Sequence, residues 1–134
     1  MMAELTLKSS CRCEVIDITQ QIDALLPPSL AVGICHVFCP HTTAGLTTNE
    51  NADPAVKQDL LATLERLVPY QAEFLQHAGG NSDAHVKAAI IGSSLALPVR
   101  NGHLDLGRWQ GVYFCDFDGP RTRWLRVFWQ SAQE

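Results

Sequence analysis

The chain has 134 residues, of which 46% are hydrophobic and 18% are charged, and its net charge is −4 at pH 7. This length suits a single domain, which we expect to span residues 1–134, with a core large enough to hold the fold. The acidic balance argues against a nucleic-acid-binding protein, and no stretch approaches the roughly 20 apolar residues that span a bilayer. Because the first residues also lack the pattern of an export signal, we expect a cytoplasmic protein.

The first third of the chain predicts strands around one short helix. Alternation predicts a strand over Cys11–Ile18, and Thr19 resembles an N-cap for a short helix that Pro27 and Pro28 would end. Leu30–Cys39 is almost continuously apolar, which is typical of a strand buried on both faces. Leu46–Thr48 predicts a second, shorter strand.

Two helices and further strands are expected in the rest of the chain. Asp53 and Pro54 form a strong helix start, with apolar residues following at helical spacing until Pro69. Ser82 or Asp83 can cap a second helix that Gly92 would close, and Tyr70–Leu75 is also expected to be helical. Strands are expected at residues 95–99, 104–106, 111–117 and 122–129, with turns at Asn101-Gly102 and Asp118-Gly119-Pro120. The sequence therefore predicts an α+β domain with a mixed, sandwich-like sheet and two to three helices.

The first polar cluster begins where the apolar strand is expected to end. His41 follows Pro40, and the two threonines and small residues after it leave room for a ligand, although a polar turn explains them equally well. Asn49 and Glu50 precede the expected helix start. A carboxylate at that place can stabilise the helix dipole, or it can serve as a metal ligand or a general base.

Two histidines form a second candidate cluster. His77 and His85 are too far apart in sequence to share one helix face, so they would come from a loop and a helix start. In the first turn of its helix His85 would face the positive end of the dipole, which keeps the imidazole neutral, the form that binds a metal. A pair of surface histidines is the alternative.

The third cluster runs from Asp116 to Arg121. Asp116 can point toward a metal, and the Arg121 guanidinium offers a planar fork for phosphate or carboxylate; an Asp–Arg pair that braces a hairpin is the alternative. Ser93 and Ser94 can contribute hydroxyl groups to an anion. The five cysteines form no CxxC pair, so we expect reduced, mostly buried thiols.

Taken together, these segments resemble the YjbQ family, uncharacterised protein family 0047, also called secondary thiamine-phosphate synthases. The resemblance runs along most of the chain, and many of its segments occur in the same order. It is carried by residues 41–45 (HTTAG), 49–54 (NENADP), 81–85 (NSDAH), 92–94 (GSS), 106–111 (LGRWQG) and 118–121 (DGPR).

The resemblance implies a compact α+β domain that assembles as a homotrimer and holds a metal through histidines, which here correspond to His41, His77 and His85. It also implies weak synthesis of thiamine phosphate, in which a thiazole phosphate displaces diphosphate from a pyrimidine methyl diphosphate. The chain departs from the expected pattern at two positions: Asp116 replaces a glutamate, and His103 replaces an arginine. Three imidazoles favour zinc, whereas a diphosphate favours magnesium or manganese.

Three functions are therefore expected, in order of preference. The first is an enzyme that acts on a phosphorylated small molecule, with Glu50 or Asp116 as base or additional ligand and with Asn49, Ser93, Ser94 and Arg121 binding the substrate. The second is a metal-dependent hydrolase of a phosphorylated or amide compound, in which the ion acidifies its bound water. The third is a non-catalytic trimer that binds a metal or a metabolite.

Overall fold

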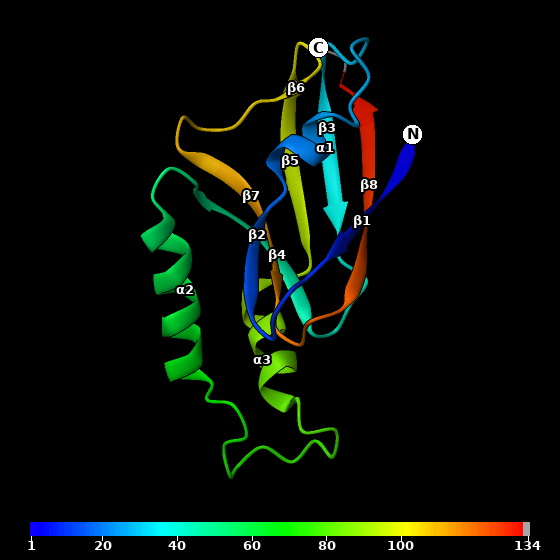
Figure 1. Cartoon of the computed structure of the whole chain (residues 1–134). Coiled ribbons are helices and arrows are strands. Elements are labelled where there is room, and N and C mark those ends of the chain that lie inside the picture. Colours follow the sequence, from blue (N-terminus) through cyan, green and yellow to red (C-terminus); the bar gives the residue numbers. More distant parts are fainter. Residues whose placement is uncertain (133–134) are drawn as a thin grey trace.

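The computed structural model describes residues 1–132 and contains eight strands and three helices within them (Figure 1). The last two residues of the expected domain, 133 and 134, lie outside the described residues. The elements in chain order are β1 (Met2–Lys8), β2 (Glu14–Asp17), α1 (Thr19–Asp23), β3 (Val32–Phe38), β4 (Ala44–Glu50), α2 (Pro54–Leu67), α3 (Ser82–Ile91), β5 (Ser94–Arg100), β6 (His103–Leu104), β7 (Gln110–Asp116) and β8 (Thr122–Ser131).

The strands form two sheets that pack face to face. One sheet has five strands in the order β1-β8-β3-β5-β6, and the other has three in the order β2-β7-β4. The α+β class and the sandwich-like arrangement are confirmed. The pairings among the described residues are all antiparallel, so the sheets are not of mixed direction.

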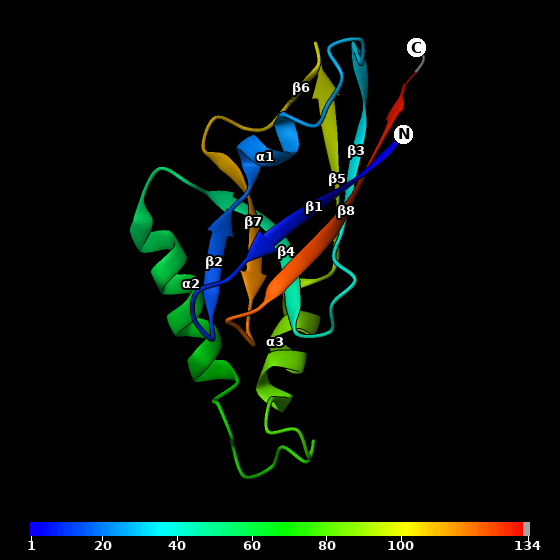
Figure 2. The same cartoon turned by 45° about the vertical axis from the view of Figure 1, so that its right-hand side comes forward.

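Strand β7 lies between the two hydrophobic cores of the domain. Because successive side chains of a strand point to opposite faces, Val112 and Phe114 contact the core between the sheets, whereas Tyr113 and Cys115 contact the core beneath the helices. Figures 1 and 2 show α2 and α3 on the outer side of the three-stranded sheet. The same alternation places Asp116, the last residue of β7, on the side that faces the five-stranded sheet.

The helix predictions are confirmed in part. The Asp53 carboxylate accepts a hydrogen bond from the Ala55 N–H at 2.9 Å, as expected for the cap of α2. Thr19, however, does not cap α1: its hydroxyl donates to Asp17 and accepts from the Val112 N–H, so it ties α1 to β7. Residues 70–75 form no helix, and the segment between α2 and α3 extends beyond the body of the domain (Figure 1).

Three strand predictions need correction. Strand β1 was not predicted, although it pairs along its whole length with β8. Burial alternates along β3, so one face is covered and the other is exposed, and the prediction of burial on both faces is wrong. Strands β7 and β8 belong to different sheets, so Asp118-Gly119-Pro120 connects two layers and forms no hairpin turn.

The Asn101-Gly102 turn is as predicted, because both residues adopt positive φ angles of 54° and 79° between the paired strands β5 and β6. Across residues 1–132, we find no helix with the length and apolar character needed to cross a membrane.

Candidate functional site

A polar hollow of about 390 Å³ lies where the loop after β3, the start of α3 and the β7–β8 connection meet. A second hollow of about 370 Å³ adjoins it and shares His41, Thr42 and His85 in its wall. Volumes of this size suit a small-molecule ligand. The first hollow is lined by Pro40, His41, Thr42, Thr43, Asn81, His85, Asp118, Arg121 and Arg123.

The backbone of β8 fixes the His41 ring. Strand β3 ends at Phe38, and the next position opposite Trp124 would be Pro40, which has no N–H to donate. The His41 Nε2 atom meets both backbone groups of Trp124, lying 2.9 Å from its carbonyl oxygen and 3.1 Å from its nitrogen. With Nε2 bare, the ring accepts from the Trp124 N–H; with Nε2 protonated, it donates to the Trp124 carbonyl. In either tautomer Nε2 is engaged, which leaves Nδ1 for other chemistry.

Burial lowers the pKa of His41, which favours the neutral ring. The hydrogen bond to the Trp124 carbonyl acts in the opposite direction, and the positive charge of Arg123 lowers the pKa further. The imidazole also packs edge-on against the Trp124 indole, with ring centroids 4.6 Å apart. His41 is therefore a neutral, rigidly held side chain at the hollow.

The other two predicted metal ligands contact each other. His85 lies in the first turn of α3, as predicted, and its ring is 4.9 Å from that of His77, which the segment between α2 and α3 carries. Within residues 1–132, however, no three or more His, Cys, Asp or Glu side chains are grouped closely enough to hold a metal ion. The side chains of this single chain therefore do not form the expected three-histidine centre as they stand.

Arg121 lines the hollow and keeps part of its donor capacity. Its Nε atom donates to the Asp118 carbonyl at 2.8 Å, and Nη2 donates to the Asp118 carboxylate at 2.9 Å. A guanidinium has five N–H donors, so these two bonds leave three for a ligand. Since 54% of the side chain is exposed, a ligand can reach them.

Asp116 is buried next to the hollow and stabilises the segments that line it. The carboxylate is fully buried, and it accepts hydrogen bonds from the Ser9 hydroxyl (2.7 Å), from Arg123 Nε (3.0 Å) and Nη2 (2.8 Å), and from the Asp118 N–H (3.0 Å). Burial alone would raise the pKa of Asp116, but these hydrogen bonds and the charge of Arg123 lower it, so the group is ionised. The geometry gives Asp116 a structural role as the buried partner of Arg123, and its role as base or metal ligand stays a prediction.

The Asp116 contacts order two loops of the hollow. Arg123 also donates to the Thr43 hydroxyl at 2.7 Å, which ties the loop that follows His41 to β8. Ser9 in turn accepts from the Arg121 N–H at 2.9 Å. The buried Asp116 carboxylate, directly and through Arg123 and Ser9, thus fixes the loop after His41 and the β7–β8 connection in place.

Three further predicted site residues line neither hollow. Glu50 ends β4, six positions from Ala44 at the hollow, and a strand of that length spans about 20 Å. Asn49 accepts from the Glu50 N–H at the same far end. The single chain therefore does not bring Asn49 and Glu50 to the histidines. Ser93 lines the second hollow as predicted, whereas Ser94 begins β5 opposite Phe38 and lines neither hollow.

Sequence reasoning missed Arg123 and Asn81 as site residues. The alternation of β8 is a signal that would have found Arg123, because it puts Arg123 on the same face as Leu125 and Val127, which are fully buried. Asn81 donates to the Asp118 carboxylate at 2.9 Å, and its own side-chain oxygen is buried without a partner among the described residues.

The fold and the hollow define a small α+β domain of two packed antiparallel sheets with a histidine- and arginine-lined site at one end. The family model described as "UPF0047 protein YjbQ-like" matches residues 3–132, and the chain belongs to this family. It is 48% identical to the UPF0047 protein YugU of Bacillus subtilis over 124 residues, which cover 92% of this chain and 94% of that protein.

Solved structures of the family share the fold. A YjbQ/UPF0047 protein from Clostridium acetobutylicum is 46% identical, with a TM-score of 0.87 over 96% of this chain and 98% of that one. The conserved hypothetical protein TT1486 of Thermus thermophilus is 40% identical and has the same TM-score, covering 97% of this chain and 99% of its own.

Proposed function

We propose that the chain is an enzyme that acts on a phosphorylated small molecule in the hollow beside His41, with thiamine-phosphate synthesis as the named candidate reaction. One observation carries the proposal: three separate segments bring two imidazoles and two guanidiniums to the wall of one hollow. Arginines suit phosphate recognition because the planar guanidinium donates two parallel hydrogen bonds to phosphate oxygens.

In the candidate reaction the thiazole nitrogen attacks the methylene carbon of the pyrimidine substrate. A C–N bond forms, the C–O bond to diphosphate breaks, and the diphosphate leaves with the electron pair. The remaining N–H donors of Arg121 would stabilise the charge on that leaving group. Because Asp118 already neutralises part of the Arg121 charge, we expect modest affinity for the diphosphate.

A hydrolase is the second candidate, and the geometry of His41 favours it. The neutral ring is fixed through Nε2, so Nδ1 is the atom that would take a proton from an attacking water. As Nδ1 gains the proton, Nε2 can remain hydrogen-bonded to the Trp124 carbonyl without any movement of the ring.

A divalent ion is the second part of the proposal, with zinc preferred and magnesium or manganese as alternatives. Contact between His77 and His85 supports two imidazole ligands. A third ligand would have to come from a reoriented His41 or from a neighbouring subunit, so we derive no reaction step from the ion. Elemental analysis of untagged protein and of its His85→Ala variant tests this part: ion content that is absent, or unchanged by the variant, would contradict it.

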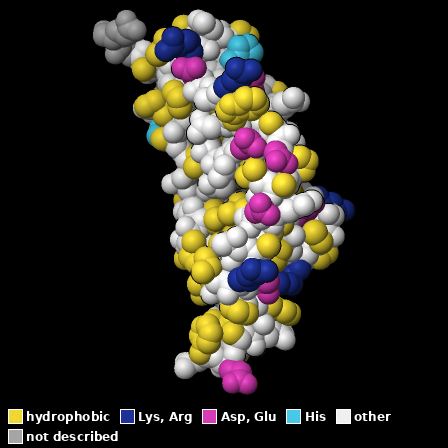
Figure 3. Space-filling view, turned by 90° about the vertical axis from the view of Figure 1, so that its left-hand side faces the viewer, with side chains coloured by type: hydrophobic (Ala, Val, Ile, Leu, Met, Phe, Trp, Pro, Cys, Tyr) yellow, Lys and Arg dark blue, Asp and Glu magenta, His cyan; other side chains and the backbone are white. Residues whose placement is uncertain are grey.

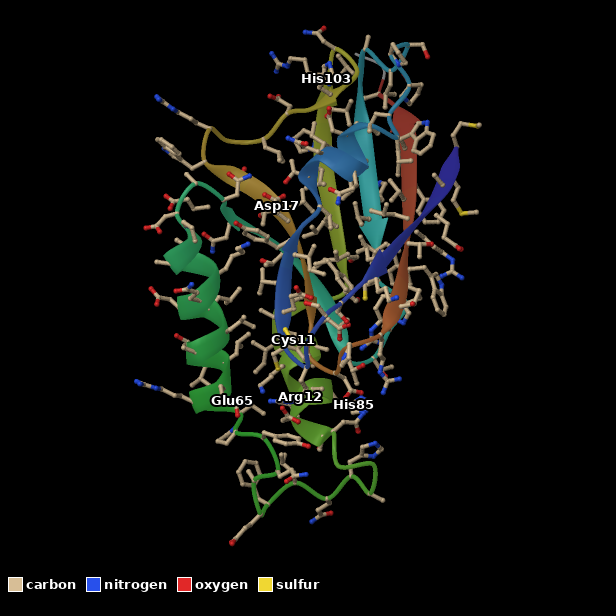
Figure 4. The ribbon with its side chains drawn as sticks, viewed as in Figure 1. Cys11, Arg12, Asp17, Glu65, His85 and His103 are labelled. Atoms are coloured by element: carbon tan, nitrogen blue, oxygen red, sulfur yellow. The ribbon has the colours of Figure 1, made fainter. Side chains whose placement is uncertain are left out.

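The activity test compares histidines at opposite ends of the molecule (Figure 4). Wild-type protein is incubated with the two thiamine precursors and with a panel of phosphoesters, with and without zinc, magnesium or manganese. We expect His85→Ala and Arg121→Gln to lose at least about tenfold in rate, whereas His103→Ala, whose ring contacts Asp23, serves as the matched control. Equal rates in all variants, or no turnover of any compound, would overturn the proposal.

We also propose that the protein is a homotrimer in the cytoplasm. The outer face of the five-stranded sheet supports assembly, because it exposes four large apolar side chains, Val32, Phe38, Trp124 and Phe128. Five free thiols support a reducing compartment. Light scattering after size-exclusion chromatography tests the assembly, and a monomeric mass would contradict it. Cell fractionation tests the compartment, and recovery outside the cytoplasmic fraction would contradict it.

A further inference from the structure

Helix α2 packs on the rest of the domain through a small part of its surface. Of its fourteen residues only Leu64 is buried. A second site, a groove of about 340 Å³, opens between α2, α3, the β1–β2 connection and the β7–β8 connection. Figure 3 views this side of the molecule, where hydrophobic side chains are exposed among acidic and basic ones. The groove is lined by Arg12, Cys13, Leu61, Ala62, Leu64, Glu65, Lys87 and Phe117.

One end of this groove is charged and combines two buried groups with two partly exposed ones. Lys87 is 1% exposed, and its ammonium donates to the Asp83 carboxylate at 2.8 Å and to the Glu65 carboxylate at 2.6 Å. Arg12 donates to the same Asp83 oxygen at 3.0 Å. Figure 4 shows Arg12 and Glu65 at the lower end of the domain, near the start of α3.

The groove is separate from the hollow beside His41. Asp83 and Lys87 are four residues apart and share one side of α3. His85 and Ala89 project from the other side, where they line the wall of the hollows described above. A ligand in the groove would therefore contact α3 on the side opposite His85.

Glu65 differs from the buried members of this cluster, Asp83 and Lys87, because its side chain is partly exposed. Its side chain is 45% exposed, whereas Asp83 is fully buried. Burial alone would raise the pKa of Asp83, but hydrogen bonds from Lys87 and Arg12 lower it, so Asp83 stays ionised. Without Glu65, two cations would face a single carboxylate, and the cluster would carry one net positive charge.

The cluster also has hydrogen-bonding capacity left over. An ammonium has three N–H donors, and the bonds of Lys87 to Asp83 and Glu65 use two of them. The second Asp83 oxygen is buried and has no partner among the described residues.

We propose that this groove binds a small amphipathic carboxylate, whose charged group replaces that of Glu65 at Lys87 and Arg12 and whose apolar part lies against Leu61, Leu64 and Phe117. The Glu65 carboxylate occupies the position of the ligand's anion in the free protein. A monoanion restores the neutrality that Glu65 provides, whereas a dianionic phosphate would leave an excess negative charge in a largely buried place. The apolar wall selects a ligand with a hydrocarbon chain or ring.

Octanoate is the probe, and its binding is followed by amide chemical shifts of the labelled full chain. We expect Glu65→Gln to bind octanoate about tenfold more tightly than wild type, because the ligand no longer competes with a tethered carboxylate for charge-assisted hydrogen bonds. Asp59→Asn is the matched control, since it also removes one carboxylate from α2 but lies outside the cluster, and its affinity should stay within about twofold of wild type.

Two further measurements complete the test. Arg12→Gln, which changes a partly exposed side chain, should weaken octanoate binding severalfold, and octanol should show no gain from Glu65→Gln. Perturbed amides should cluster on α2, on the β1–β2 connection and on the side of α3 that carries Lys87. Equal affinity of Glu65→Gln and wild type, an equal gain in Asp59→Asn, tighter binding of inorganic phosphate than of octanoate, or shifts confined to other surfaces would each overturn the proposal.

Discussion

The buried pair of Asp116 and Arg123 gives the sharpest prediction about stability. Replacing Asp116 by asparagine removes the negative charge while keeping the side-chain shape, and it presents an amide N–H₂ to groups that now donate to a carboxylate. Arg123 is only 5% exposed, so its guanidinium would be left buried without its counter-charge. Breaking a buried ion pair in this way costs about 3–5 kcal/mol.

That cost is a large share of the total stability. A domain of this size unfolds with a free energy of about 5–15 kcal/mol, so Asp116→Asn should lower the thermal midpoint by roughly 10–20 °C. Chemical denaturation followed by circular dichroism measures the free energy of unfolding. Asp105→Asn is the matched control, because Asp105 pairs with Arg100 at an exposed position and should cost less than about 1 kcal/mol.

A double-mutant cycle separates the ion pair from the shape of the side chains. If the loss in Asp116→Asn comes from an unpaired cation, then adding Arg123→Met should recover at least about 2 kcal/mol relative to the sum of the single variants. Additive losses would refute the reasoning, and so would a cost for Asp116→Asn no larger than that for Asp105→Asn.

The remaining predictions concern acid stability, thiol chemistry and close packing. The fold lowers the Asp116 pKa below its ordinary value of about 4, so the stability that this carboxylate contributes is present at neutral pH and is lost as the pH falls below about 4. Urea titrations at several pH values should therefore show that the free energy of unfolding of Asp116→Asn depends less on acid pH than that of wild type. An unchanged pH profile would contradict this. Burial raises the thiol pKa of Cys35 to about 11 and that of Cys115 to about 12, so a thiol reagent at pH 8 should modify exposed Cys11 first. Equal rates of modification at the three cysteines would refute this. A Cβ added at Gly45 would lie 2.6 Å from the Gly92 carbonyl oxygen, so Gly45→Ala should push α3 away from β4. We expect the free energy of unfolding to fall by about 1–3 kcal/mol and the His85 ring resonances to shift. Unchanged stability and unchanged resonances would contradict this.

Local chemistry made much of the fold predictable. Asp53-Pro54 and Asn101-Gly102 act through their own backbone geometry, so the start of α2 and the β5–β6 turn could be recognised from neighbouring residues. Strand β1 was missed because it is held by its pairing with β8. The chain positions of the two strands are more than 100 residues apart, and no local pattern reports such a pairing.

The candidate site was predictable in its residue types and less so in their roles. His41, His85 and Arg121 were expected at one site, and all three line the hollow. The burial of Asp116 against Arg123, and the place of Glu50 at the far end of β4, depend on contacts between strands. A carboxylate that ends a strand looks the same in sequence whether it faces solvent or a buried arginine on another sheet.

The edge-on contact between His41 and Trp124 gives the protein an optical probe of its own site. An imidazolium quenches indole emission more strongly than a neutral imidazole does, and the two rings are only 4.6 Å apart. Fluorescence of Trp124, isolated by replacing Trp109 and Trp129 with phenylalanine, should therefore dim when His41 gains a proton at low pH. The same indole is also exposed on the outer face of the five-stranded sheet. Its emission would therefore report both on protonation of His41 and on contacts made at that face.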